Sequence, residues 1–401
     1  MRQPGRERRW IVVAGLFTVT FGVSNPLAAF GVFLPILSDV FGWSRGAIAV
    51  AQSLNMVLGG VAGFAVGAIG DRSGPRVVLS VTVVIAGLGF AAGSLVNSLW
   101  QFYFCLGLLV GIGASGLYIL STATIARWFD DRRGLALGLV LTGFNLGFMT
   151  GGPTAAFLIE RVGWRPAYVV LGLAVCAIGG LAGLFVRNPS QAPTAATARD
   201  LRDRVRPRLS LRDALVDRRF WLLGGSWFSL GSVFMTLMVH IVPYMRDRGV
   251  SLERASLALT AYGLGAMTGR IVFGAVSDRL SAMATMRWCV VIQVGSLVTL
   301  LLGPPQWLAA AMLILFGFGF AGADTVVVKA IPDVVGLQSL GAIMGVLGLA
   351  WRCGAALGPA TAGFIYDATG SYVLPFGAAP ILLIASFVLF VYGALPSRAH
   401  A

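Results

Sequence analysis

Long apolar stretches are the feature that most constrains how this 401-residue chain can fold. Each is close to or above the length of about 20 residues that a helix needs to cross a bilayer. Because backbone polar groups in lipid must be satisfied internally, such stretches become helices, and we predict an all-α polytopic membrane protein with twelve transmembrane helices. The stretches lie at residues 10–38, 46–69, 76–97, 100–127, 135–159, 166–187, 220–245, 254–277, 287–303, 307–331, 341–366 and 373–395.

Composition excludes several other classes of protein. Hydrophobic residues make up 57% of the chain and charged residues only 11%, whereas a soluble domain carries about 25% charged residues. The chain has two histidines, no spacing typical of metal ligands and no G-x-x-x-x-G-K-[ST] loop for ATP. We therefore expect no enzyme activity, no cofactor, no metal and no nucleic-acid partner.

The basic residues predict the orientation in the bilayer. With the N-terminus inside, 22 of the 30 basic residues fall in cytoplasmic segments, six fall outside, and Arg270 and Arg352 lie within predicted helices. The positive-inside tendency then places both termini in the cytoplasm and favours a multi-pass protein of the cytoplasmic (inner) membrane. The arginine-rich residues 188–219 are predicted to form a cytoplasmic linker between six-helix bundles at 1–187 and 220–401.

An internal repeat supports the division into two bundles. A shift of 207 residues superposes two separate groups of residues with one offset, which predicts two parallel six-helix repeats of the kind from which transporters are built. The shift places Gly67, Asp71, Arg72, Gly134, Gly138, Gly147 and Gly151 on Gly274, Asp278, Arg279, Gly341, Gly345, Gly354 and Gly358.

Several motifs resemble those of a known family. The segments GAIGDRSGPR (67–76) and GAVSDR (274–279) resemble the cytoplasmic signature of the major facilitator superfamily and its second copy. The segments GFMTGGP (147–153) and GAALGP (354–359) resemble its glycine-rich motif in helices five and eleven. Three further segments are similar to the branch of monocarboxylate transporters and oxalate/formate antiporters: RWFDDRRGLALG (127–138), GWRPAY (163–168) and YDATGSY (366–372).

The cytoplasmic signature has a mechanical interpretation. A carboxylate at a helix end can pair with arginine and with the positive end of another helix, closing the cytoplasmic side. The alternative is a plain loop salt bridge, which contributes little when it is exposed. The predicted gating residues are Gly67, Asp71, Arg72, Gly74, Arg76, Asp278 and Arg279.

Charges inside predicted helices are the leading candidates for a binding site, because each costs about 3 kcal/mol or more at mid-bilayer unless paired or hydrated. The resemblance implies that Arg270 anchors the substrate anion and that Arg352 is a second basic contact. Monocarboxylate transporters usually carry an aspartate one turn before that arginine, where this chain has Ala266. Asp324 is the candidate for proton coupling through an ion pair with either arginine; a permanent structural pair is the alternative.

Four residues without a formal charge complete the predicted substrate site. Tyr118, Asn25, Asn145 and His240 lie in predicted helices and offer hydrogen bonds to cargo, and His240 is a second candidate for proton coupling. For each of them the alternative is a hydrogen bond between helices.

These features lead to one preferred function and two alternatives. We expect a monomeric secondary transporter that moves small organic anions, most simply monocarboxylates, by alternating access with proton symport or exchange for a counter-anion. Efflux of amphipathic or drug-like compounds is the first alternative, and a non-transporting membrane sensor is the second.

Overall fold

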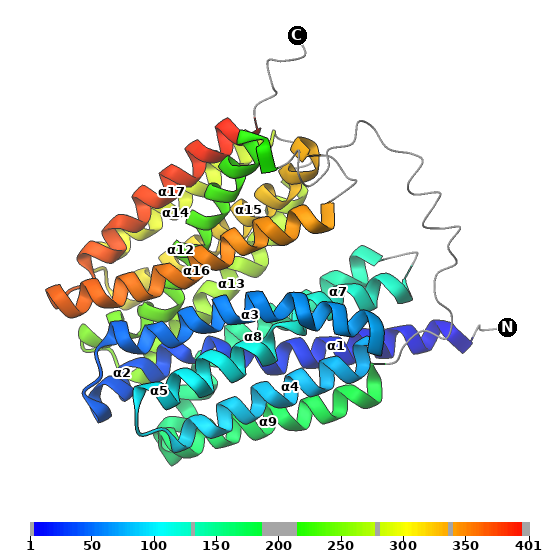
Figure 1. Cartoon of the computed structure of the whole chain (residues 1–401). Coiled ribbons are helices and arrows are strands. Elements are labelled where there is room, and N and C mark those ends of the chain that lie inside the picture. The colour runs from blue at the N-terminus through cyan, green and yellow to red at the C-terminus, as the bar shows by residue number, and fades with distance from the viewer. Residues whose placement is uncertain (1–3, 130–132, 187–214, 277–280, 336–339, 395–401) are drawn as a thin grey trace, which may run out of the picture. The chain divides into compact units, whose positions relative to one another are not determined.

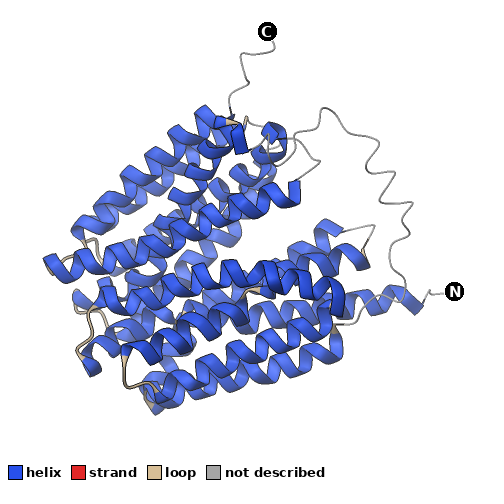
Figure 2. Ribbon diagram, viewed as in Figure 1, coloured by secondary structure: helices blue, strands red, loops and turns tan. Residues whose placement is uncertain are grey.

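The computed structural model describes residues 4–129, 133–186, 215–276, 281–335 and 340–394. Within these ranges the chain is helical with short connecting loops, and no strand is present (Figures 1 and 2). The predicted linker falls largely outside them, at residues 188–214, and so do Asp278 and Arg279 of the predicted gate.

Helices coincide with all twelve predicted stretches. In the first repeat they are α1 (Pro4–Ala28), α2 (Phe30–Phe41), α3 (Arg45–Ser73), α4 (Pro75–Ala92), η1 (Gly93–Leu95), α5 (Leu99–Phe102), η2 (Tyr103–Leu109), α6 (Val110–Ala114), α7 (Gly116–Trp128), α8 (Arg133–Val162) and α9 (Trp164–Phe185). In the second repeat they are α12 (Arg218–Asp247), α13 (Leu252–Val276), α14 (Ala282–Leu301), α15 (Gln306–Val335), α16 (Leu340–Thr369) and α17 (Val373–Ala394).

Two of the predicted stretches are interrupted helices. The first is divided into α1 and α2 three residues after Pro26, which lacks the amide hydrogen that would continue the helix ladder. The fourth contains a π-helical segment, η2, flanked by α5 and α6. The Asn55 side-chain amide donates to the Leu106 carbonyl of η2 at 3.1 Å. This bond supplies a donor to a carbonyl in the irregular turn, where the usual ladder is disturbed.

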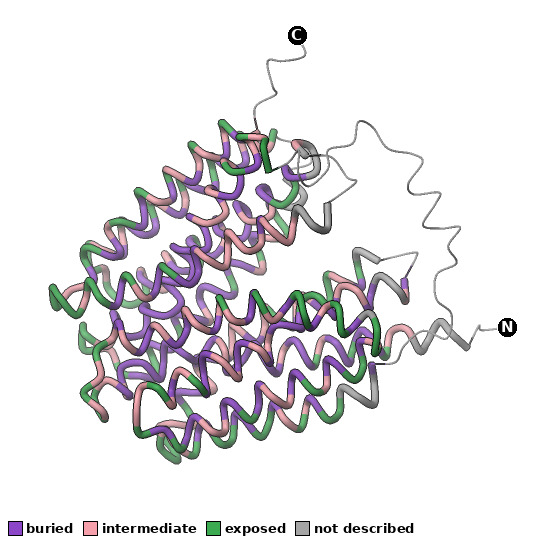
Figure 3. Tube along the Cα trace, viewed as in Figure 1, coloured by how far each residue is buried: buried purple, intermediate pink, exposed green. Residues whose placement is uncertain are grey.

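Hydropathy separates two helices from the rest. Ten helical stretches in the described ranges are long and apolar enough to cross a membrane. Helices α13 and α16 are not among them, and these are the helices that carry Arg270 and Arg352. Exposed positions recur along the helices (Figure 3). Many of them carry large apolar side chains, among them Trp307 at 73% and Trp100 at 68% exposed. Apolar exposure on this scale suits contact with lipid and not with water.

Packing groups the helices into two compact units. One unit comprises residues 1–192 with 238–260, and the other comprises 193–237 with 261–401. The end of α12 and the start of α13 therefore pack with the first unit. There Arg45 forms two bonds with Asp247, Nη1 to Oδ2 at 2.7 Å and Nη2 to Oδ1 at 2.6 Å. The sequence-based bundle boundaries at 1–187 and 220–401 follow the repeat and stay a prediction.

Glycines bring α8 and α1 into close contact in the first unit. A Cβ atom at Gly147 would meet the Phe21 carbonyl oxygen, and one at Gly151 would meet the carbonyl oxygen of Asn25. Only glycine permits this approach, because any larger residue would push the two helix backbones apart.

The second unit repeats this contact between α16 and α12. A Cβ atom at Gly354 would meet the Phe228 carbonyl oxygen, and one at Gly358 would meet that of Ser232. Both the glycines and their carbonyl partners lie 207 residues after their counterparts in the first unit. The internal repeat found in the sequence is thus reproduced in helix packing.

Candidate functional site

The centre of the candidate site is a carboxylate in contact with two other helices of the second unit. Asp324 lies on α15; its Oδ2 atom is 3.3 Å from Nη2 of Arg270 on α13. Its Oδ1 atom accepts a hydrogen bond of 2.9 Å from the Trp227 indole on α12. Each carboxylate oxygen therefore has a different partner. The expected ion pair involving Asp324 is found, and its arginine is Arg270.

Close helix packing makes this pair possible. Cβ atoms at Gly265 and Gly269 of α13 would meet the carbonyl oxygens of Ile314 and Phe318 on α15. The two backbones are therefore near enough for Arg270, one residue after Gly269, to reach the carboxylate of Asp324. Glycine spacing thus determines which charged side chains meet.

Neither member of the ion pair is sealed from its surroundings. The Arg270 side chain is 40% exposed and that of Asp324 22%. A guanidinium carries five N–H donors in a planar fork, and the contact with Asp324 engages one nitrogen at 3.3 Å. The remaining donors leave Arg270 able to bind a second anion.

Arg352 lies on α16, two residues before Gly354, and is partly buried. Within the described ranges it has no recorded hydrogen bond or ion pair, and nothing joins it directly to Arg270 or Asp324. A guanidinium within a predicted membrane-spanning stretch favours an anionic ligand or hydration when no described side chain pairs with it.

Aromatic side chains lie beside the ion pair. Tyr262 on α13 is 5% exposed and close enough to Arg270 and Asp324 to interact with both electrostatically. Its ring centroid is 5.5 Å from that of Phe234 and 6.2 Å from that of Phe320. Tyr262 thus connects the ion pair to an aromatic cluster that includes Phe234 and Phe320.

Sequence reasoning missed Trp227 and Tyr262. The signal for Trp227 was available, since an indole N–H buried among apolar helices needs an acceptor, and Asp324 is the acidic residue well inside a predicted span. What the sequence did not contain was the rotation of α12 that turns the indole toward α15.

The neutral candidates occupy varied environments. The Asn25 side-chain amide donates to Thr150 Oγ1 at 3.0 Å, which links α1 to α8. Asn145 on α8 is partly buried, and its side chain makes no hydrogen bond to the part of the chain that the structure describes. Tyr118 on α7 is 60% exposed. His240 is fully buried in the part of α12 that packs with the first unit. These four residues therefore do not share a compact unit with the charged pair.

The predicted gating residues are described only in part. Gly74 has a φ of 84° at the turn between α3 and α4, a conformation suited to glycine. A Cβ atom at Gly67 would lie 3.3 Å from Ile119 on α7. Arg72 and Arg76 are exposed. The side chain of Asp71 lies outside what the structure describes, as do Asp278 and Arg279.

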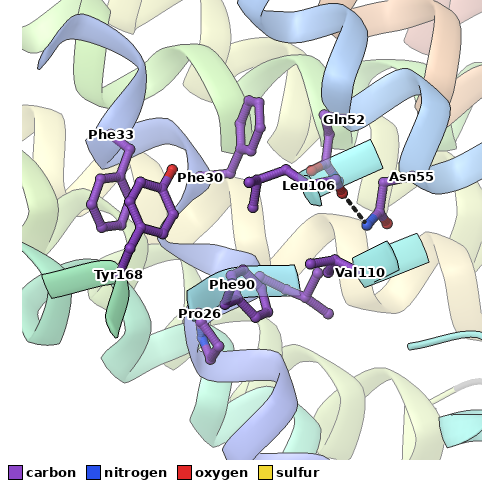
Figure 4. Close-up of a pocket in the computed structure, with 10 residues that line it drawn as sticks. Pro26, Phe30, Phe33, Gln52, Asn55, Phe90, Leu106, Val110 and Tyr168 are labelled. Atoms are coloured by element: carbon purple, nitrogen blue, oxygen red, sulfur yellow. Dashed lines mark hydrogen bonds between the residues drawn. The ribbon is translucent and has the colours of Figure 1, made fainter. Parts of the chain in front are cut away.

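A small pocket lies in the first unit (Figure 4), whereas Arg270, Asp324 and Arg352 belong to the second. It has an empty volume of about 260 Å³, and its wall is aromatic and aliphatic apart from the polar groups of Gln52, Asn55 and Tyr168. Tyr168 stacks on Phe33 with ring centroids 4.0 Å apart. Because no charged side chain lines it, this pocket does not form the anion site.

Comparison with known proteins gives a consistent result. A sequence profile of the Major Facilitator Superfamily matches residues 12–321 and 236–401. Human monocarboxylate transporter 11 is 28% identical over 96% of this chain and 83% of its own length. Monocarboxylate transporter 12-B of Danio rerio is 27% identical over 95% of this chain and 86% of its own length.

Among solved structures, a bacterial homologue of the human lysosomal transporter Spinster, in an inward-facing and unoccupied conformation, has the same fold. Its TM-score is 0.72 at 17% identity, over 98% of this chain and 96% of that chain. The sequence profile covers most of the chain, and the fold agrees with it. The chain is a multi-pass membrane protein and belongs to the Major Facilitator Superfamily of transporters.

Proposed function

We propose that this protein is a secondary transporter for small organic anions, with monocarboxylates as the simplest cargo. The observation that carries the proposal is Arg270, a cation within a predicted membrane-spanning stretch. Among the described residues its hydrogen bond is the 3.3 Å contact with Asp324, which leaves most of its donors open. Two relatives are named monocarboxylate transporters, which supports the same class of cargo.

Binding follows from the chemistry of the guanidinium. Its planar fork matches a carboxylate with two parallel hydrogen bonds, and such charge-assisted pairs are stronger than neutral ones. Arg352 has no protein partner in the described ranges and supplies a second positive charge. Asn145, Tyr118, Asn25 and His240 remain proposed neutral contacts.

Asp324 provides a route for energy coupling. The Asp324 carboxylate and the cargo carboxylate compete for Arg270. Protonation of Asp324 removes its negative charge and so leaves the guanidinium available to the cargo. In proton symport, the carrier converts between its outward-facing and inward-facing conformations with both the proton and the cargo anion bound. In anion exchange, a second anion replaces the first at Arg270 before the carrier converts back. His240 is the second proposed proton group.

Alternating access is the proposed transport cycle, as in other transporters built from two repeats. The glycine contacts α8–α1 and α16–α12 keep each repeat compact while it moves. The motif around Asp71 and Arg72, with its second copy at Asp278 and Arg279, is proposed to close the cytoplasmic side. We place both termini in the cytoplasm and the protein, as a monomer, in the cytoplasmic membrane.

Uptake by proteoliposomes tests this function. Purified protein is reconstituted and given labelled acetate, lactate and pyruvate with the interior more alkaline than the exterior. Arg270→Ala is expected to lower uptake by about 100-fold or more, since a buried charge-assisted pair is lost. Arg270→Lys keeps the positive charge but loses the planar fork of donors. Its uptake rate is expected to lie between those of the unmodified protein and Arg270→Ala.

Arg254→Lys is the matched control, because Arg254 is exposed on the same helix. It should transport like the unmodified protein. Undiminished uptake of all three anions by Arg270→Ala would overturn the anchor role, and no uptake by the unmodified protein would overturn the choice of cargo.

The aromatic rings beside the ion pair favour one alternative, efflux of amphipathic compounds. Phe234, Tyr262 and Phe320 form a buried aromatic cluster, and an apolar ring system is the kind of cargo that such rings would favour. Export of an amphipathic dye that is unaffected by Arg270→Ala would support this alternative.

A further inference from the structure

We infer that Trp227 is a positioning residue that fixes Asp324 and so keeps Arg270 exchangeable between Asp324 and cargo. The inference rests on the proposed function and adds a residue that contacts neither the cargo nor the proton. It is carried by the indole hydrogen bond, from Trp227 Nε1 to Asp324 Oδ1 at 2.9 Å.

The two bonds to Asp324 differ in quality. Hydrogen bonds from N–H to oxygen are usually 2.7–3.2 Å long. The indole bond lies inside this range, whereas the 3.3 Å contact with Arg270 lies outside it. The indole bond is therefore the better formed of the two in geometry, and the contact with Arg270 is the looser one.

The orientation of the carboxylate follows from the same bond. With Oδ1 engaged by Trp227, only Oδ2 faces Arg270, so the arginine meets the carboxylate through one oxygen. Without the indole donor, Asp324 can turn both oxygens toward the guanidinium and form the two-bond pair that arginine prefers. Such a pair would compete with cargo for the same face of Arg270.

Trp227 can donate its hydrogen bond to Asp324 in both the ionised and the protonated state. An indole is a donor only, and it can donate to a carboxylate or to the carbonyl oxygen of a neutral carboxyl group. The carboxyl group can therefore lose Arg270 and gain a proton on Oδ2 without leaving its place on α12.

The test is a double-mutant cycle with a matched control. Trp227→Phe removes the N–H donor and keeps an aromatic ring; it is made in the unmodified protein and in Asp324→Ala. Trp221→Phe is the control on the same helix, since its indole donates to the Leu215 carbonyl at 2.8 Å and not to Asp324. Anion exchange is measured with whichever of acetate, lactate and pyruvate the unmodified protein carries fastest.

Trp227→Phe is expected to raise KM about threefold to tenfold, the size of one hydrogen bond, and to leave the maximal rate within about twofold. In Asp324→Ala the same change is expected to leave KM unaltered, because the competing carboxylate is gone. Trp221→Phe should leave KM unaltered in both backgrounds. An equal rise in KM with and without Asp324, or no rise in either, overturns the inference.

Thermal unfolding in detergent gives a readout that does not depend on transport. The loss in melting temperature from Trp227→Phe should be larger in the unmodified protein than in Asp324→Ala, while Trp221→Phe should cost the same in both. If Trp227→Phe lowers the melting temperature equally in the unmodified protein and in Asp324→Ala, the hydrogen bond between Trp227 and Asp324 does not contribute to stability and the inference fails. If the unmodified protein carries none of the three anions, the proposed cargo fails, and this cycle still decides whether Trp227 holds Asp324.

Discussion

The two repeats share their packing and differ in their chemistry. Glycine pairs join α8 to α1 and α16 to α12 through carbonyl groups that correspond at one sequence offset. The charged residues of the candidate site have no such correspondence. At that offset Arg270 corresponds to Gly63, Asp324 to Leu117 and Arg352 to Asn145.

The same asymmetry includes the residue that holds the carboxylate. Trp227 of the second repeat corresponds to Thr20 in the first, whose hydroxyl donates to the Val140 carbonyl of α8 at 2.9 Å. The first repeat thus uses this position to join two helices, whereas the second uses it to fix a charge. One scaffold supports both, and the charged residues proposed to bind the anion all lie in the second repeat.

The largest effect is expected from substitutions that disrupt the glycine contacts shared by the two repeats. Gly151→Val and Gly358→Val each force a branched side chain into a backbone carbonyl, and both should abolish accumulation of folded protein or lower its melting temperature by many degrees. Size-exclusion chromatography and thermal unfolding measure this loss. Gly138→Val is the control, because nothing lies within 4 Å of a Cβ atom at Gly138. Normal stability of either variant would show that the contact is not needed.

The next largest effect is expected at the position where the second repeat has Arg352 and the first has Asn145. Arg352→Asn installs the residue of the first repeat, and we expect about a tenfold or larger rise in KM because a charged hydrogen-bond donor is lost. Asn145→Ala, the matched change in the first repeat, should alter KM by less than about threefold, the size of one neutral bond. Initial rates of labelled-anion uptake give both values. Equal effects would mean that the two repeats contribute alike.

The smallest effect concerns a charged pair of the first unit. Arg45 and Asp247 form a two-bond pair with side chains 13% and 32% exposed. Partly exposed pairs contribute about 1 kcal/mol or less, so Arg45→Ala should lower the melting temperature only slightly, and less at high salt. The exchange Arg45→Asp with Asp247→Arg should recover most of the loss. No recovery would show that the charges themselves do not account for it.

Much of the fold was predictable because hydropathy and glycine spacing are local signals. The twelve stretches follow from bilayer thickness alone, and the offset between Gly147 and Gly354 survives as matching helix contacts. The break after Pro26 was visible as a proline within an apolar run. The π-helical turn at 103–109 was not, since no local pattern marks it and the Asn55 bond that accompanies it joins residues distant in sequence.

The candidate site was predictable in its charges but not in its contacts. Arg270, Arg352 and Asp324 are conspicuous because charge is rare in these helices. Which arginine contacts Asp324 depends on how closely α13 approaches α15. Whether the Trp227 indole reaches Asp324 depends on the rotation of α12 about its axis. The grouping of residues 238–260 with the first unit likewise reflects packing that no sequence pattern encodes.

Competition between Asp324 and cargo for Arg270 is the central claim, and equilibrium binding tests it most directly. Isothermal titration calorimetry at pH 8 compares the unmodified protein, Asp324→Asn and Arg270→Ala for the best-transported monocarboxylate. Asp324→Asn is predicted to bind about tenfold or more tightly than the unmodified protein, since its competitor has lost its charge, and Arg270→Ala is predicted not to bind. Equal or weaker binding by Asp324→Asn would contradict the account.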